Sequence, residues 1–446
     1  MLPAHLLDNT TAIAGRRRPS IPADRDLPDA ADLLAGAGAR SVARFLEERG
    51  LDPHRVEPAQ VHYRPGRSLA ICFRTAGVDR SSGRQACLTV TLERRAGEPA
   101  AVWAFPDDPA LPGLAAATHG GLVRRRLRPR PSEVAVEPLR YRPRRRAVLR
   151  YRLPGGRTLF GKVVPPKRAG RLLALAHALG GAGDGGLRLA LPVGRIAPGA
   201  LVLPCLPGAS LRDLLMAGGP LPTPDRLAAL PEALHRRCLP ALAGEAETRP
   251  APTGDRAPTR PGLAGDRTPT RPAPAGGRAP TRRRVDPGTA LGAAQVVARL
   301  LPGEACAAER LADDLIGRAE ASEPAEEWVV HGDLYESQVL VDGETLGLID
   351  LDDLGPGDPL LDGANFSAHL LLLGTSGPAG NLILRYREEL RVAFLRTLDA
   401  DAAALAWREA YCLLRLVPGP FRVLHSEWPR RMAARLELAA SALQGL

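Results

Sequence analysis

The chain has 446 residues, of which 45% are hydrophobic and 24% charged, and its formal net charge is +11. These values are ordinary for a globular protein, and the length allows two or three domains. No stretch approaches the ~18 consecutive apolar residues of a membrane-spanning helix. Residues 1–20 lack the basic start and apolar block of a secretory signal. We therefore expect a cytoplasmic protein with no membrane partner.

The positive charge is concentrated in one segment. Residues 249–284 contain nine arginines and two aspartates, so they carry +7 and the rest of the chain carries +4. A Gly-Asp-Arg motif followed by Pro-Thr-Arg recurs there at eleven-residue spacing, beginning at Gly254 and Gly265. Such tracts bury too little apolar surface to offset the entropy of ordering. We predict a disordered insertion at 245–290 and expect no nucleic-acid partner. The alternative is a site for nucleic acid or another anionic partner, in which case deletion of 249–284 would abolish salt-dependent DNA retention.

Two similar hairpin signals lie in the first part of the chain. The sequence VHYRPGR at 61–67 is echoed by LRYRPRR at 139–145, and each follows a Val-Glu-Pro and precedes a β-rich run. The second run leads through a Pro-Gly-Gly turn into a strand at 158–164 with Lys162 in its middle. A short helix at 169–179 and a strand at 200–204 are expected next.

Lys162 is one of two lysines in the chain, beside 58 arginines. Lysine and arginine are not interchangeable where a phosphate is held, so the retained lysine favours a functional role. The alternative is an ordinary residue on the surface of a strand.

Beyond residue 208 the apolar residues recur at three- and four-residue spacing. This pattern predicts helices at 220–244, 293–321, 381–398, 402–417 and 427–443. The exception is 328–350, which is typical of a strand, a loop and a hairpin that turns at Asp342-Gly343.

The predicted hairpin brings Gln338 and Asp350 to the same open end. An amide oxygen and a carboxylate are suitable ligands for Mg²⁺, which is bound by few protein oxygens together with substrate phosphates. Asp333 lies five residues before Gln338 in the loop. It is therefore free to face the same cavity and to accept or orient the proton of an attacking hydroxyl.

These residues resemble the pattern of aminoglycoside-phosphotransferase-like kinases. The matching motifs are His331-Gly332-Asp333-Leu334, Gln338, Ile349-Asp350 and Gly357-Asp358-Pro359, followed by Asp362. The resemblance covers about 134–446. It implies an α+β, two-lobed protein-kinase-like fold with a β-rich small lobe and a mostly helical large lobe.

The resemblance also implies roles for single residues. Asp333 would be the catalytic aspartate, Gln338 and Asp350 the Mg²⁺ ligands, and Lys162 the residue that holds the α- and β-phosphates of ATP. The nucleotide would also contact the following residues: Cys205 and Leu206 in the hinge beside adenine, and Arg145 in the turn of 142–146.

Three features depart from the family pattern. Gln338 replaces the commoner asparagine, as in maltokinases, and keeps the amide oxygen. No carboxylate occurs between Lys162 and Asp184, so the helix after the lysine offers no glutamate to orient it. The small lobe has arginines where a glycine-rich phosphate loop is expected. We expect metal binding to survive the change at Gln338. The missing glutamate and the missing glycine-rich loop favour an alternative, a catalytically inactive kinase-fold protein that binds nucleotide or acts as a scaffold.

The expected domains are a β-containing N-terminal extension at 1–130 that packs on the small lobe, the small lobe and hinge at 131–208, and the large lobe at 209–446. The expected activity is ATP-dependent phosphorylation of a hydroxyl on a small molecule such as a sugar, an amino sugar (aminoglycoside) or an amino alcohol. The acceptor and the oligomeric state stay open.

Several polar residues near the motif have structural interpretations. We expect His331 to bond the loop backbone, and Asp358 and Asp362 to brace the loop or cap a helix. Asp352 and Asp353 are expected to be exposed loop carboxylates, with a metal or acceptor contact as the alternative.

Overall fold

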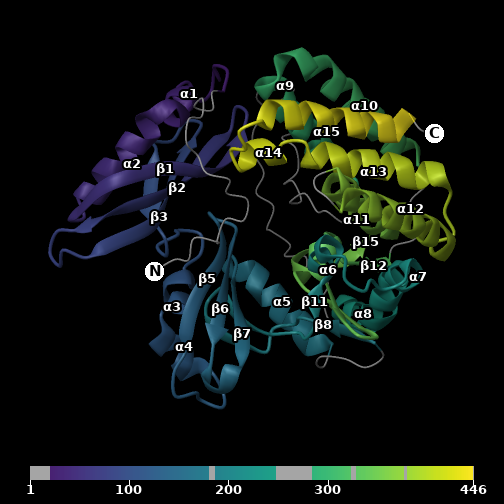
Figure 1. Ribbon diagram of the computed structural model, residues 1–446, viewed down its shortest axis with the longest axis horizontal. Helices are drawn as coiled ribbons and strands as arrows, with labels where there is room; N and C mark the ends of the chain where they lie inside the picture. Colours follow the sequence, from purple (N-terminus) through teal and green to yellow (C-terminus); the bar gives the residue numbers. More distant parts are fainter. Residues whose placement is uncertain (1–20, 180–185, 248–283, 323–327, 376–378, 445–446) are drawn as a thin grey trace, which may run out of the picture.

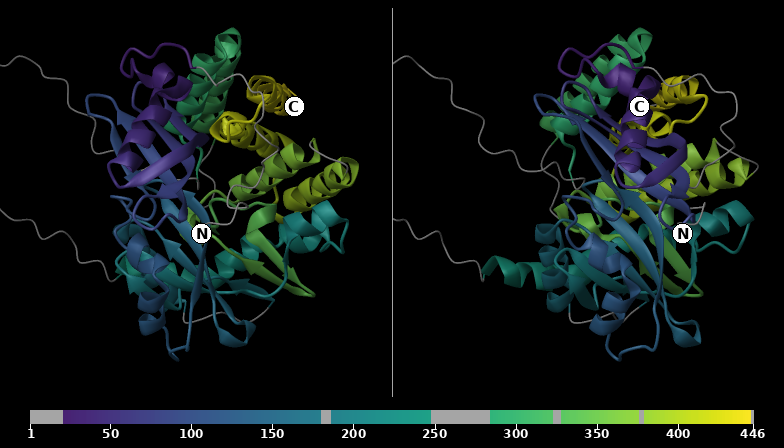
Figure 2. Two further views of the ribbon diagram at one scale, coloured as in Figure 1. Left: turned by 60° about the vertical axis from the view of Figure 1, so that its left-hand side comes forward. Right: turned by 90° about the vertical axis from the view of Figure 1, so that its left-hand side faces the viewer.

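The computed structural model describes residues 21–179, 186–247, 284–322, 328–375 and 379–444. Most of the expected insertion, residues 248–283, lies outside these ranges. Figures 1 and 2 show three parts: an N-terminal β-rich unit, a small lobe and a helical large lobe. The predicted α+β, two-lobed fold is confirmed.

The N-terminal unit is an antiparallel sheet of four strands in the order β1-β2-β3-β4, preceded by short helices. Its elements are α1 (Ala30–Asp32), the π-helical η2 (Leu33–Ala37), α2 (Gly38–Glu47), β1 (Leu51–Arg64), β2 (Ser68–Asp79), β3 (Gln85–Arg95) and β4 (Ala101–Ala104). The first predicted hairpin is the β1–β2 pair. Two short helices, α3 (Leu114–Thr118) and α4 (Gly120–Arg126), lead to the small lobe.

The small lobe is a five-stranded antiparallel sheet in the order β5-β6-β7-β10-β9. Its elements are β5 (Ala135–Arg142), β6 (Arg146–Arg152), the 3₁₀ turn η3 (Pro154–Gly156), β7 (Thr158–Val163), α5 (Pro166–Ala178), β9 (Gly194–Ala197) and β10 (Ala200–Pro204). Side chains along β6 alternate between buried and half-exposed, as strand geometry requires. Helix α5 begins three residues before the predicted start, because a proline suits the first helical turn.

The large lobe is mainly helical. Its helices are α6 (Leu211–Ala217), α7 (Pro224–Ala228), α8 (Leu230–Glu247), α9 (Pro287–Leu300), the 3₁₀ turn η4 (Pro302–Glu304), α10 (Ala305–Ala321), α11 (Pro359–Gly374), α12 (Gly380–Thr397), α13 (Ala402–Leu416), α14 (Gly419–Arg422) and α15 (Trp428–Gln444). None of the helices in the described part of the chain is long and apolar enough to cross a membrane.

The structure also corrects two other predicted helices and the bounds of the expected insertion. The helix expected at 293–321 is divided by Pro302, which cannot continue the backbone hydrogen bonds of α9. The helix expected at 220–244 is divided into α7 and α8. The expected insertion at 245–290 is too wide, because α8 runs to Glu247 and α9 begins at Pro287, where Asp286 accepts a hydrogen bond from the Thr289 N–H at 2.7 Å.

Short strands between α10 and α11 carry the motif residues. They are β12 (Trp328–Val330), the 3₁₀ turn η5 (Glu336–Gln338), β13 (Val339–Asp342), β14 (Thr345–Leu348), the 3₁₀ turn η6 (Leu351–Asp353) and β15 (Gly355–Gly357). Strands β13 and β14 form the predicted hairpin, with Asp342 paired to Thr345 and Gly343 in the left-handed region at φ +54°. The sheet is completed by β11 (Ala209–Ser210) and β8 (Leu187–Leu189).

The N-terminal unit packs on the small lobe, where packing was expected, and also on the large lobe. Val61 and Ile71 of its sheet share a hydrophobic core with Leu405, Tyr411 and Phe421 of the large lobe. In contrast, α3 and α4 pack on the small-lobe sheet. The extension therefore bridges the lobes, because the apolar face of its sheet is covered by helices from the far end of the chain.

Candidate active site

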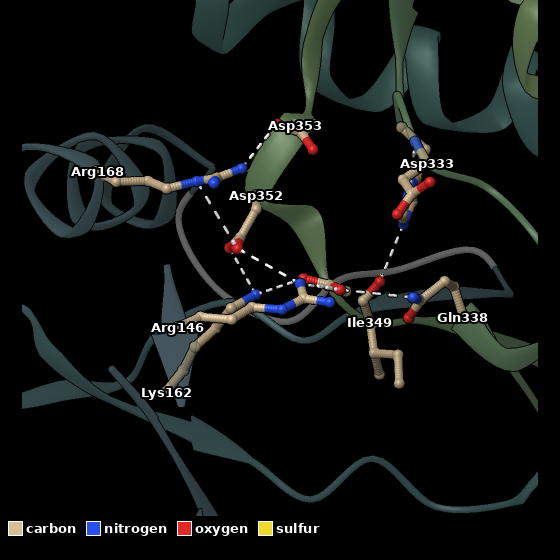
Figure 3. A network of polar contacts seen from close by, with 10 residues as sticks. Arg146, Lys162, Arg168, Asp333, Gln338, Ile349, Asp352 and Asp353 are labelled. Atoms are coloured by element: carbon tan, nitrogen blue, oxygen red, sulfur yellow. Dashed lines mark hydrogen bonds and ion pairs between the residues drawn. The ribbon is translucent and has the colours of Figure 1, made fainter. Parts of the chain in front are cut away.

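Lys162 lies at the centre of an ion-pair network between the lobes (Figure 3). Its Nζ atom is 2.6 Å from Oδ1 of Asp350 and 2.5 Å from Oδ1 of Asp352. The side chain of Lys162 is 7% exposed and that of Asp352 is 3% exposed. Because water is nearly excluded from this pair, the attraction between the charges is stronger than at the protein surface.

Arg146 approaches the same carboxylates from the start of β6. Its guanidinium is 2.5 Å from Oδ2 of Asp350 and 3.8 Å from Oδ2 of Asp352. Burial alone would lower the pKa of Arg146, but Asp350, Asp352 and Asp333 together raise it. The carboxylate of Asp333 is thus one of the charges near Arg146.

The pKa of Asp350 is held below its ordinary value by these partners. Burial would raise this pKa, but the charges of Lys162 and Arg146, and their hydrogen bonds to the carboxylate, have the larger combined effect. Asp350 is therefore ionised at neutral pH, which is the form that a metal ion requires.

Helix α5 contributes a cation to the network rather than a carboxylate. Arg168 places its Nε atom 3.7 Å from Oδ2 of Asp352 and its NH2 group 2.7 Å from Oδ1 of Asp353. Arg171 of the same helix donates a hydrogen bond to the Leu354 carbonyl. The expectation that Asp352 is an exposed loop carboxylate is wrong, because η6 folds beneath α5 and buries it; Asp353 is half-buried.

The β13–β14 hairpin brings Gln338 and Asp350 together. Ile349 donates its N–H to the Gln338 carbonyl at 3.0 Å, and Nε2 of Gln338 lies 3.5 Å from Oδ2 of Asp350. Asp350 itself has φ +61°, a left-handed conformation that aspartate tolerates better than most residues. The turn at Asp350 thus directs its side chain toward Gln338 and the small lobe.

The residues at this end fit a magnesium ion. The amide oxygen of Gln338 and the ionised carboxylate of Asp350 are ligands of the type that Mg²⁺ binds, and phosphate oxygens would supply further ligands. Within the described ranges, no group of three His, Cys, Asp or Glu side chains forms a metal site. The protein alone therefore provides a partial set of ligands.

The loop that carries Asp333 is fixed by buried hydrogen bonds. Asp362 of α11 accepts the N–H groups of His331 at 2.7 Å and Gly332 at 2.9 Å. The Nδ1 atom of His331 accepts the Asp333 N–H at 3.3 Å, so its Nε2 donates to the Ile349 carbonyl at 2.9 Å. His331 and Asp362 thus have the bracing geometry that their structural interpretation requires.

A second support lies at the start of α11. Asp358 accepts the Leu360 N–H at 3.0 Å and forms an ion pair with Arg408 of α13 at 2.6 Å. It therefore caps the helix that carries Asp362.

The predicted nucleotide contacts lie at different places. Cys205 is exposed and Leu206 is buried, in the segment between β10 and β11 where the small lobe meets the large lobe. Arg145 lies in the β5–β6 turn, exposed and near His62 of the N-terminal sheet. The residue of this turn that reaches Asp350 is its neighbour Arg146, so a nucleotide contact for Arg145 stays a prediction.

Sequence reasoning did not assign Asp352, Arg168 and Arg146 to the ion-pair network around Lys162. The absence of a carboxylate on the helix after Lys162 indicated that another group must face the lysine. It did not identify Asp352, because the contact joins residues 190 positions apart through the packing of the lobes.

The sequence pattern of the "Phosphotransferase enzyme family" matches residues 155–395, which is more than half of the chain. The chain belongs to this phosphotransferase family. The match includes Lys162, the Asp333 loop and the hairpin with Gln338 and Asp350. No curated protein sequence matches the phosphotransferase.

Solved structures with similar coordinates include several small-molecule kinases. A type I macrolide 2′-phosphotransferase is 16% identical and has a TM-score of 0.38. The alignment covers 68% of this chain and 91% of that chain, and the coverages below are given in the same order. An aminoglycoside phosphotransferase in a ternary complex with ADP and hygromycin B is 16% identical, with a TM-score of 0.41 and coverage of 69% and 94%. Choline kinase from Cryptosporidium parvum is 8% identical, with a TM-score of 0.43 and coverage of 73% and 94%.

Proposed function

We propose that this phosphotransferase transfers the γ-phosphoryl group of ATP to a hydroxyl of a small molecule, with Mg²⁺ as the metal. The observation that carries the proposal is the meeting of Lys162, Asp350 and Gln338 between the lobes, beside the braced loop of Asp333. Phosphoryl transfer needs positioned charges more than covalent chemistry, and this site gathers both signs of charge in a buried setting.

Asp333 is the residue proposed to align the acceptor. Its loop is fixed by Asp362 and His331, so its carboxylate is held on the large-lobe side of the site. There it can accept a hydrogen bond from a substrate hydroxyl and take its proton as the oxygen attacks phosphorus.

Lys162 and Arg146 are the proposed partners of the nucleotide phosphates. Gln338 and Asp350 would hold Mg²⁺, which when bound would neutralise charge on the β- and γ-phosphates. Asp350 contacts Lys162 and Arg146 through different oxygens, so these cations lie next to the proposed metal position.

Asp352 is proposed to orient Lys162. In the family pattern a glutamate of the helix after the lysine has this role, but here the helix offers Arg168 and the large lobe offers the carboxylate. The helix that follows the lysine thus carries a cation, Arg168, where the family pattern has a carboxylate. The missing glutamate is no argument for an inactive protein if Asp352 replaces it.

An ADP-release assay of the purified protein against sugars, amino sugars and amino alcohols tests the proposal. We expect magnesium-dependent ADP release with at least one acceptor, and loss of that release in Asp333→Ala. If ATP with Mg²⁺ stabilises the protein against heat but no acceptor gives ADP, the inactive kinase-fold alternative is favoured.

A further inference from the structure

The β1–β2 hairpin of the N-terminal unit and the β5–β6 hairpin of the small lobe have the same design. In both, the strand register shifts directly after the proline of a Val-Glu-Pro, at Pro58 and Pro138. Both turns have three residues, and the middle one is left-handed: Gly66 at φ +66° and Arg144 at φ +59°. Arginine is uncommon in this conformation, so the shared backbone is a property of the unit rather than of the turn sequence.

Each turn is held by a buried aspartate from the segment that precedes its hairpin. In the N-terminal unit, Oδ2 of Asp24 accepts the Tyr63 hydroxyl at 2.7 Å and the Gly66 N–H at 2.9 Å. Oδ1 of Asp24 also accepts the N–H two residues later, at 3.1 Å.

The small lobe repeats this arrangement. Oδ2 of Asp108 accepts the Tyr141 hydroxyl at 2.8 Å and the Arg144 N–H at 2.7 Å, and its Oδ1 accepts the N–H of Ala110 at 2.8 Å. The hydrogen bonds of the two aspartates match one for one, and we therefore treat residues 21–95 and 105–163 as two copies of one structural unit.

The third strand shows how the copies differ. Counting from the turn in each hairpin, Ala70 of β2 corresponds to Val148 of β6. Ala70 pairs with Glu93, and Val148 pairs with Lys162. The N-terminal copy therefore has the buried Glu93 at the position that Lys162 occupies in the small lobe. The charge at this position is negative in one copy and positive in the other.

Glu93 contacts the turn of the other copy. Its Oε2 atom lies 2.5 Å from Nε of Arg144, whose guanidinium also lies over the ring of Trp103 at 5.2 Å. Arg144 is thus held by its backbone through Asp108 and by its side chain through Glu93. Two residues further along the chain, Arg146 forms its ion pair with Asp350.

We propose that the N-terminal copy is a clamp that fixes the β5–β6 turn, so that Arg146 faces the phosphates of the nucleotide. This inference rests on the proposed function. A glycine-rich loop binds phosphate with backbone N–H groups, whereas here a rigid turn presents an arginine side chain. Glu93 and Asp108 are positioning residues, because they act on the nucleotide only through Arg144 and the turn.

The test is the affinity for Mg²⁺ with AMP-PNP, measured by calorimetry, which needs no acceptor. Glu93→Gln and Arg144→Gly are each expected to weaken binding about tenfold, since a small displacement of a charged group lowers its contribution strongly. Arg144→Gly is expected to fold, because Gly66 occupies the same position in the other copy. The double variant is expected to be no weaker than the single variants, since both remove one contact.

Asp24→Asn and Asp108→Asn form a matched pair of controls. Both replace one acceptor oxygen with an NH₂ group against the same set of hydrogen bonds in the same type of turn, so both are expected to lower the unfolding temperature by similar amounts. Only Asp108→Asn is expected to weaken nucleotide binding, by about tenfold.

Three results would overturn the clamp. They are wild-type affinity in Arg144→Gly, additive losses in the double variant with Glu93→Gln, and equal losses in Asp24→Asn and Asp108→Asn. Failure of the wild-type protein to bind Mg²⁺ with AMP-PNP would instead refute the proposed function, and the clamp with it.

Discussion

The Nζ atom of Lys162 lies 2.5 Å from Oδ1 of Asp352, a carboxylate of the large lobe rather than of the helix that follows the lysine. The small-lobe lysine is therefore oriented across the interface between the lobes. A motion that separates the lobes would break this ion pair, whereas a pair with the following helix would lie within one lobe.

The neutral variant Asp352→Asn measures the contribution of this ion pair. Within the described residues, Asp350 would then be the carboxylate left beside Lys162, and it is also the proposed metal ligand. Loss of a hydrogen bond to a charged group costs about 1.5–3 kcal/mol, so the Kd for ATP with Mg²⁺ should rise at least about tenfold. Asp353→Asn is the control, because the neighbouring carboxylate of Asp353 forms its ion pair with Arg168 and not with Lys162. Equal effects of the two substitutions would contradict a special role for Asp352.

Moving the carboxylate from position 352 to helix α5 should restore ATP binding. In Arg168→Glu with Asp352→Asn, the glutamate stands on α5, where the family pattern has one. We expect each single variant to bind ATP more weakly than the double variant, because Arg168→Glu alone places two carboxylates together. Binding by the double variant as weak as that of the worse single variant would argue against the reversed arrangement. Titration by calorimetry gives the three affinities.

Asp333→Ala separates chemistry from binding. The loop is braced through the backbone by Asp362 and His331, so removal of the side chain should leave the fold and the nucleotide affinity unchanged. Turnover should fall about 10²- to 10⁴-fold, as expected for a positioned base. Steady-state ADP release gives kcat, and calorimetry gives the affinity. Full activity in Asp333→Ala would exclude the proposed role.

Gln338 tests the metal ligands. Gln338→Asn keeps an amide oxygen and is expected to retain activity, whereas Gln338→Leu has a similar volume and no oxygen. For Gln338→Leu, the Mg²⁺ concentration that gives half-maximal activity should rise at least about tenfold. The comparison is made by titrating MgCl₂ at saturating ATP. An unchanged requirement in Gln338→Leu would show that Asp350 and the phosphates hold the ion without the amide.

His62 makes stability depend on pH. Burial and the charges of Arg422, Arg142, Arg145 and Arg64 lower its pKa to about 3. Between pH 3 and 6.5 the unfolded chain therefore binds more protons at this residue than the folded chain, and stability falls as the pH falls through 6.5. At pH 5 the loss from this group is about 2 kcal/mol.

Urea unfolding from pH 7.5 to 5 checks this prediction. The wild-type protein should lose about 2 kcal/mol more unfolding free energy than His62→Gln over this interval. His54→Gln is the control, because His54 is exposed on the same strand. A wild-type curve parallel to that of His62→Gln would contradict the lowered pKa.

Local patterns were sufficient for the hairpin that joins Gln338 and Asp350. A turn signal between two short apolar runs fixes both the pairing and its register, so the two side chains had to lie at one end. The same holds for Lys162 in β7, because its strand is bounded by a turn and a proline. The helix at 293–321 was predicted wrongly as one element, although Pro302 was visible in the sequence.

The sequence by itself determined the family motif, the strands and helices that carry it, and the presence of two related hairpins. These depend on residues close together in the chain. Only the tertiary structure decided that Asp352 faces Lys162, that Arg146 rather than Arg145 reaches Asp350, and that Glu93 holds Arg144. The physical reason is that each of these ion pairs joins segments far apart in sequence, and the packing of large apolar surfaces, not the charges themselves, determines which segments meet.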